Sequence, residues 1–91
     1  TGFDCSGLTM WAWARGGRSL PHSSSAQYAA TQRISLDQLQ PGDLVFFNNP
    51  ISHVGLYIGG GQMIHSPHTG DVVKISPITR MGKLVRAGRV A

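Results

Sequence analysis

Residues 41–66, with the sequence PGDLVFFNNPISHVGLYIGGGQMIHS, decide the fold of this chain. A turn signal, Pro41-Gly42-Asp43, stands directly before an apolar run, which is typical of a buried strand. Three consecutive glycines separate two further β-prone runs and predict a hairpin turn. We therefore expect three successive strands here: Leu44 to Phe47, Val54 to Ile58, and Gln62 to His65.

The residues before this stretch predict two short helices. Apolar residues and alanines run from about Cys5 to Ala14 and are followed by Gly16-Gly17, which suits a buried helix with a glycine stop. Asp4 is the expected N-cap, so Cys5 falls in the first helical turn. A second helix is expected from Ser25 to about Thr31, followed by a connector with room for one helical turn from Ile34 to Leu39.

The residues after it predict two more strands, Val72 to Ile75 and Leu84 to Val90, with a turn at residues 67–70 between the third strand and the fourth. The order is helices first and then an antiparallel meander of about five strands. This order predicts an α+β fold, with the cysteine-bearing helix packed on the sheet.

The composition suits one globular domain, which we expect to span residues 1–91. Hydrophobic residues make up 41% and charged residues 13% of the chain, and the apolar runs are too short to cross a bilayer. The net charge is +4, and half of the 8 basic residues lie near the end of the chain, where they alternate with apolar residues. That alternation favours a solvated face over a nucleic-acid interface. The basic residues concerned are Arg80, Lys83, Arg86 and Arg89.

The single cysteine, Cys5, is the first candidate for chemistry. A thiol at a helix N-terminus faces unpaired backbone N–H groups and the positive end of the helix dipole, which favour the nucleophilic thiolate. A lone cysteine is more often an inert, small, buried residue. It has no partner for an internal disulfide.

Two histidines, His53 and His65, fall on neighbouring predicted strands. The hairpin brings them close, so one ring can orient the other. If the cysteine-bearing helix packs across the sheet, the thiolate meets His53, which would act as base while His65 fixes its tautomer. Two alternatives remain: polar fillers at a sheet edge, or a zinc site that also takes in Cys5 and His68. The spacing of these four residues lacks the regularity of structural zinc motifs.

Four motifs in the same order resemble those of the NlpC/P60 family of cell-wall cysteine peptidases. They are Asp4 to Leu8, Leu39 to Phe47, His53 to Gly59, and Met63 to Pro67. The resemblance implies a papain-like core fold and hydrolysis of peptidoglycan stem peptides, typically between γ-D-glutamate and meso-diaminopimelate or L-lysine. It also implies an extracytoplasmic location, no metal or organic cofactor, and neither nucleic-acid binding nor membrane insertion.

Carried over by motif, Cys5 is the nucleophile, His53 the base and His65 the third, orienting residue. Asp4 and Ser6 match positions that line the substrate groove. Ser24 and Gln27 match a segment near the cleft.

The chain departs from the family pattern at its start. Family members carry a helix and a tyrosine-containing loop before the cysteine motif, and this sequence begins within that motif at Thr1. We therefore expect an N-terminally incomplete domain from a longer protein, with an apolar face open to a second copy or a partner segment. Two other functions stay open: a peptidoglycan-binding module without turnover, and an amidase or acyltransferase on the same papain-like core.

Overall fold

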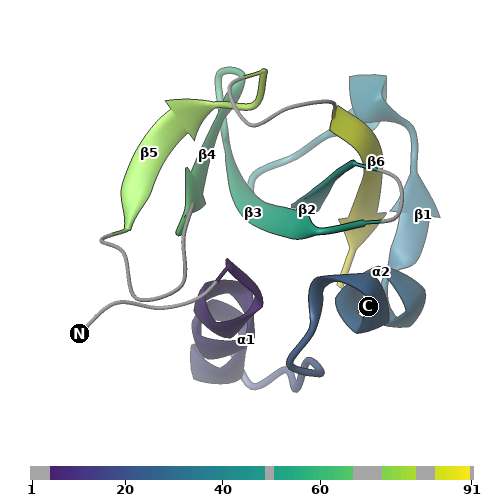
Figure 1. Cartoon of the computed structure of the whole chain (residues 1–91), viewed down its shortest axis with the longest axis vertical. Coiled ribbons are helices and arrows are strands. Elements are labelled where there is room, and N and C mark those ends of the chain that lie inside the picture. Colours follow the sequence, from purple (N-terminus) through teal and green to yellow (C-terminus); the bar gives the residue numbers. More distant parts are fainter. Residues whose placement is uncertain (1–4, 49–50, 67–72, 80–83, 91) are drawn as a thin grey trace.

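The computed structural model describes residues 5–48, 51–66, 73–79 and 84–90. Two α-helices lie on one side of a curved, six-stranded antiparallel sheet (Figure 1). The helices are α1 (Cys5–Arg15) and α2 (Ser24–Ala30), and a short 3-10 helix, η1, covers Leu36–Gln38. The strands are β1 (Gln32–Ile34), β2 (Leu44–Phe47), β3 (His53–Gly59), β4 (Gln62–His65), β5 (Lys74–Pro77) and β6 (Leu84–Arg89).

The strands lie in the order β1-β6-β2-β3-β4-β5. The predicted meander is confirmed for β2 to β5, in which each strand pairs with the next. The final strand does not extend the meander, because β6 lies between β1 and β2. The sequence predicts about five strands and does not predict β1, whose three residues pair with the edge of β6 that faces away from β2. The α+β fold class is confirmed.

Two glycine turns set the register of the central strands. Pro41 and Gly42 occupy the middle of a turn closed by a 3.0 Å hydrogen bond from Asp43 N to Gln40 O, and Gly42 has the positive φ of 98° that a type II turn requires. Gly60 and Gly61 form the two-residue connection between β3 and β4, with φ of 63° and 76°. Both turns were predicted, and both are confirmed.

Strand β2 is buried on both faces, as its apolar composition predicts. One face joins Leu44 and Phe46 to the helix side of the molecule, where Leu20 and Val54 complete a cluster. The other face packs Val45 and Phe47 against Met63. Alternate residues of one strand therefore stabilise two separate layers.

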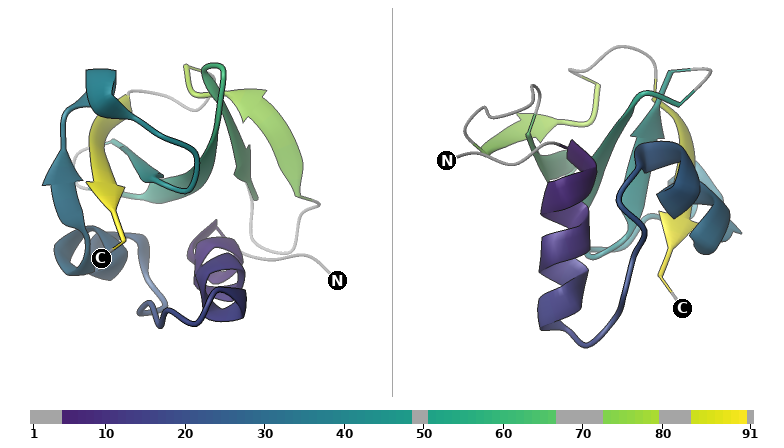
Figure 2. Two further views of the ribbon diagram at one scale, coloured as in Figure 1. Left: turned by 180° about the vertical axis from the view of Figure 1, so that it is seen from behind. Right: turned by 60° about the horizontal axis from the view of Figure 1, so that its bottom comes forward.

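Helix α1 packs against β3, and its first turn is the end nearest the sheet (Figures 1 and 2). Trp13 packs against the helix-side cluster, whereas Trp11 is 48% exposed and lies at the rim. Helix α2 begins after Ser23, whose side chain accepts a hydrogen bond from Ala26 N. Its Tyr28 ring meets Phe46 edge-on at 5.2 Å.

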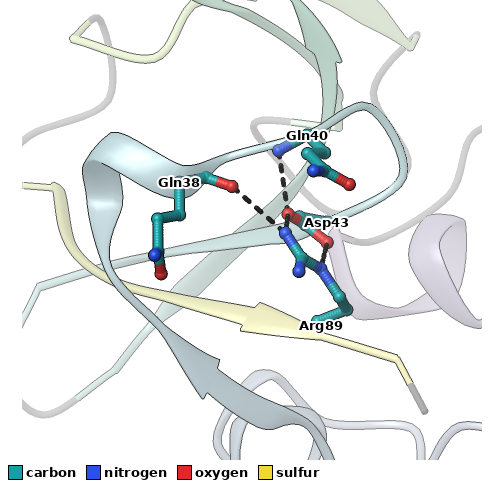
Figure 3. A network of polar contacts seen from close by, with 4 residues as sticks. All are labelled: Gln38, Gln40, Asp43 and Arg89. Atoms are coloured by element: carbon teal, nitrogen blue, oxygen red, sulfur yellow. Dashed lines mark hydrogen bonds and ion pairs between the residues drawn. The ribbon is translucent and has the colours of Figure 1, made fainter.

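A buried carboxylate ties β6 to the turn before β2 (Figure 3). Asp43 accepts hydrogen bonds from Arg89 through both oxygens, at 3.0 and 2.9 Å, and one from Gln40 N at 2.9 Å. The same guanidinium reaches Gln38 O at 3.1 Å. Arg89 is thus a structural partner of Asp43 rather than one member of a solvated basic face.

Several predicted boundaries differ from the structure. Strand β5 is Lys74–Pro77 rather than Val72 to Ile75. Val72, the predicted turn at 67–70, and the proposed N-cap Asp4 lie outside the described residues. The helical turn expected between Ile34 and Leu39 is confirmed as η1. In the described part of the chain, no helix is long and apolar enough to cross a bilayer.

Candidate active site

Cys5 is the first residue of α1 and has a free, half-buried thiol. Its side chain packs against the cluster that contains Val54, the neighbour of His53 at the start of β3. The sequence favours a helix here because small residues and leucine follow the cysteine. Helix α1, which Cys5 begins, packs against β3, the strand that begins with His53.

His53 and His65 are joined by a hydrogen bond between Nε2 of the first and Nδ1 of the second, at 3.0 Å. The two rings meet nearly perpendicular, with an interplanar angle of 78°. His53 is 6% and His65 1% exposed, and the Phe47 ring lies 5.6 Å from that of His53. The hairpin of β3 and β4 therefore brings the two predicted histidines together.

The second ring nitrogen of His65 also has a partner. Its Nε2 lies 2.9 Å from the hydroxyl oxygen of Ser76 on β5. Ser76 was not predicted from the sequence, since the fourth strand was expected to end at Ile75. The contact of Ser76 with His65 depends on the pairing of β4 with β5, for which the sequence gives no local signal.

Burial lowers the pKa of His65 below its ordinary value of 6.5, and the ammonium of Lys74 lowers it further. Lys74 is the residue that pairs with His65 across β4 and β5. His65 is therefore a neutral imidazole at neutral pH, with one donor and one acceptor nitrogen. Such a ring can accept a hydrogen bond from an N–H group of His53 without adding a second charge to the site.

The predicted substrate residues lie in different surroundings. Asp4 lies outside the described residues. Ser6 is 7% exposed, and Ser24 is half-buried at the start of α2. Gln27 is completely buried between the two helices.

The amide of Gln27 is used inside the protein. Its Nε2 donates to Ser6 O and to Pro21 O, both at 2.8 Å, and Thr9 donates its hydroxyl hydrogen to Oε1. In this structure the side chain of Gln27 is buried and hydrogen-bonded within the protein, and its role near the substrate stays a prediction. Its side chain links α2 to the turn that carries Cys5.

Within residues 5–48, 51–66, 73–79 and 84–90, no three His, Cys, Asp or Glu side chains gather as metal ligands. His68, the fourth member of the zinc alternative, is not among those residues.

Comparisons with known proteins identify the family and the fold of the chain. The model of the NlpC/P60 family matches residues 1–86. A Listeria monocytogenes protein named as a probable endopeptidase p60 is 53% identical over 95 residues, which cover 99% of this chain and 19% of that protein. The chain spans about a fifth of the length of such relatives, 23% for a probable endopeptidase of Mycobacterium tuberculosis.

Two solved structures from Mycobacterium tuberculosis mark the functional range. The peptidoglycan hydrolase RipB superposes with a TM-score of 0.87 at 35% identity, over 98% of this chain and 45% of that one. RipD, described as a non-catalytic NlpC/p60 domain protein adapted to peptidoglycan binding, superposes with a TM-score of 0.85 at 38% identity, over 100% of this chain and 69% of that one. The fold therefore accommodates both hydrolysis and binding.

Proposed function

The chain belongs to the NlpC/P60 family, and on that premise we propose that residues 1–91 form a cysteine endopeptidase domain acting on peptidoglycan stem peptides. Relatives named as endopeptidases and a peptidoglycan hydrolase of the same fold support this class of activity. A substrate in the cell wall puts the site of action outside the cytoplasmic membrane.

The observation that carries the proposal is the hydrogen bond between His53 and His65, two buried imidazoles on β3 and β4, the strands against which α1 packs. Cys5 is the first residue of that helix. A thiol at a helix start and two linked imidazoles are the set that nucleophilic catalysis requires, and a purely structural role does not need all three.

In the proposed reaction, the Cys5 thiolate attacks the scissile carbonyl carbon and forms a tetrahedral oxyanion. The backbone N–H of Cys5, at the start of α1, is proposed as a donor to that oxygen. His53 holds the proton taken from the thiol and delivers it to the leaving amine as the C–N bond breaks. Water then attacks the thioester, gives its proton to His53, and releases the carboxylic acid and the free thiol.

The family resemblance supports the bond from γ-D-glutamate to the diamino acid as the target, with Asp4, Ser6 and Ser24 near the substrate. A second copy or partner segment over an open apolar face also stays a prediction. Neither a metal nor an organic cofactor takes part in the proposed reaction.

A second function, peptidoglycan binding without turnover, is supported by the likeness to RipD. An amidase or acyltransferase on the papain-like core is a third. The three functions differ in their products. An endopeptidase creates new peptide ends, a binding module creates no product, and an amidase or acyltransferase changes a different amide or acyl bond.

The test is mass spectrometry of purified muropeptides after incubation with this chain, beside Cys5→Ala. Fragments cut after γ-D-glutamate, absent with the variant, are expected for the endopeptidase. Intact muropeptides that are retained by both proteins would support the binding module instead. Circular dichroism of both proteins establishes that each is folded.

A further inference from the structure

Ser76 lies next to the histidine pair and contacts the ring nitrogen of His65 that does not face His53. It sits on β5, opposite Met63 of β4, one diagonal step from His65. Its hydroxyl oxygen is 2.9 Å from His65 Nε2, and the side chain is half-buried. Diagonal neighbours on adjacent strands lie within reach of a long side chain such as histidine.

We propose that Ser76 is a positioning residue whose hydroxyl oxygen accepts the Nε2–H of His65 and so keeps His65 Nδ1 as the acceptor for His53. The inference rests on the proposed function, because it concerns the proton that His53 carries during the reaction. Ser76 touches neither substrate nor the reacting atoms in this account.

The imidazolium form of His53 determines the direction of these hydrogen bonds. When His53 is the imidazolium partner of the thiolate, both of its ring nitrogens carry hydrogen. Its Nε2–H then needs an acceptor, and the atom 3.0 Å away is His65 Nδ1. A neutral His65 whose Nδ1 accepts must carry its hydrogen on Nε2, which points at the lone pairs of Ser76.

The opposite arrangement would disfavour the ion pair. If Ser76 donated to His65 Nε2, the His65 hydrogen would sit on Nδ1 and face the Nε2–H of protonated His53. Two N–H groups would then oppose each other at the distance of a hydrogen bond. A doubly protonated His65 is disfavoured as well, because the ring is 1% exposed and Lys74 lies across the strand pair.

The titratable groups around His65 come from three elements of the described chain. His53 lies on β3, Lys74 lies on β5, and Cys5 begins α1, which packs against β3 and β4. The ammonium of Lys74 disfavours a second proton on His65, but it does not select which ring nitrogen carries the first one. In the proposal, the contact with Ser76 makes that selection.

The first measurement is independent of activity. Long-range proton–nitrogen NMR spectra of the full chain with ¹⁵N-labelled histidine distinguish protonated from unprotonated ring nitrogens. We expect His65 of the wild type to carry hydrogen on Nε2 at neutral pH, and Ser76→Thr to keep this state. Ser76→Ala should populate the Nδ1–H form. A wild-type His65 protonated on Nδ1 overturns the proposal, whatever the variants do.

The second measurement is muropeptide cleavage as a function of pH. Ser76→Ala should lower kcat about 3- to 10-fold, the rate equivalent of one neutral hydrogen bond, and leave KM unchanged. The His53 imidazolium is then less stabilised, so the alkaline limb of the kcat/KM profile should move to lower pH. Ser76→Thr should restore both, and Ser25→Ala, the same change at an exposed serine of α2, should alter neither.

The outcomes separate this inference from the proposed function. A wild type that cleaves nothing but carries His65 hydrogen on Nε2 contradicts the function and leaves the positioning role intact. Turnover and pH profile unchanged in a folded Ser76→Ala contradict the positioning role and leave the function intact. If Ser76→Ala does not fold, the wild-type NMR result decides alone.

Discussion

The side-chain amide of Gln27 donates a 2.8 Å hydrogen bond to the backbone carbonyl of Ser6, the residue that follows Cys5. The same nitrogen donates to Pro21 O at 2.8 Å, so one buried group joins α2, the preceding loop and the first turn of α1. The position of the proposed nucleophile thus depends on a residue from another helix.

Replacing Gln27 by methionine keeps the approximate volume but removes these bonds. We expect Gln27→Met to lower the free energy of unfolding by about 1–3 kcal/mol, because the buried hydrogen bonds of Gln27 with Ser6 and Thr9 are lost. Turnover should fall as well, since the turn that carries Cys5 loses an anchor. Urea denaturation and muropeptide cleavage measure the two effects. Gln38→Met, at an exposed glutamine, is the control, and equal stability of the two variants would contradict the role.

The two histidines should differ in their effect on turnover. His53→Ala removes the group that transfers the proton, a contribution of roughly 10²- to 10⁴-fold in rate. His65→Ala removes orientation alone, so its loss of kcat should be smaller. Steady-state cleavage by both variants, with thermal melts to verify folding, checks the order. Equal losses would count against the assigned roles.

Stability should decrease as the pH falls below about 6.5, the ordinary pKa of histidine. The pKa of His65 is lowered in the folded protein by burial and by Lys74, so between that lowered value and 6.5 the unfolded chain binds more protons than the folded one. Folding therefore loses stability as acid is added through this window.

Melting temperatures of wild type and His65→Asn between pH 7.5 and pH 5 measure the effect. The wild type should lose more stability over this range than the variant. His22→Asn, which removes an exposed imidazole from the loop before α2, is the matched control. A wild type and a His65→Asn variant with parallel pH dependence would disprove the assignment.

The carboxylate of Asp43 should matter more than an exposed one. Asp43→Asn puts an amide NH₂ group where an oxygen accepts from Arg89, so two donors face each other at a site that is 3% exposed. We expect the melting temperature to fall by about 5–10 °C, given the sensitivity of domains of this size. Calorimetry of Asp43→Asn beside Asp37→Asn, an exposed carboxylate, tests this; equal shifts would refute it.

Gly88 should tolerate no side chain. It pairs with Leu44 on one side and Arg33 on the other, and a methyl group there would lie 2.7 Å from Thr31 Cβ and 3.2 Å from Phe46 Cε2. Gly88→Ala should therefore force Thr31 and Phe46 to shift and destabilise the protein by about 1–3 kcal/mol. Gly16→Ala, whose methyl group meets ordinary contacts at 3.5 Å, is the control. Chemical denaturation compares the two.

Local patterns predicted the centre of the fold. Leu44 to Phe47 is a continuous apolar run with a turn signal before it, and the three glycines after β3 admit a tight hairpin. His53 and His65 follow from that hairpin, because its register brings their strands side by side. These features depend on residues that are close together in the sequence, so the sequence alone predicts them.

Features that depend on distant pairing were missed. Strand β1 is short and largely exposed, and it exists because β6 pairs with it. Ser76 meets His65 because of the register of β5, which the expected boundary at Ile75 misplaced. The burial of Gln27 follows from the packing of α2 on α1, for which one glutamine in a polar segment gives no signal.

The place of β6 between β1 and β2 has a consequence for how the protein is made. Synthesis delivers Cys5 before residues 84–89, and β1 and β2 have no shared partner in the described sheet until those residues arrive. The sheet therefore closes only after β6 has left the ribosome, and the long-range pairing makes closure slow. During that interval Cys5 is part of a protein whose central strand β2 still lacks one of its two partners, so the first helix is made well before the sheet that it covers is complete.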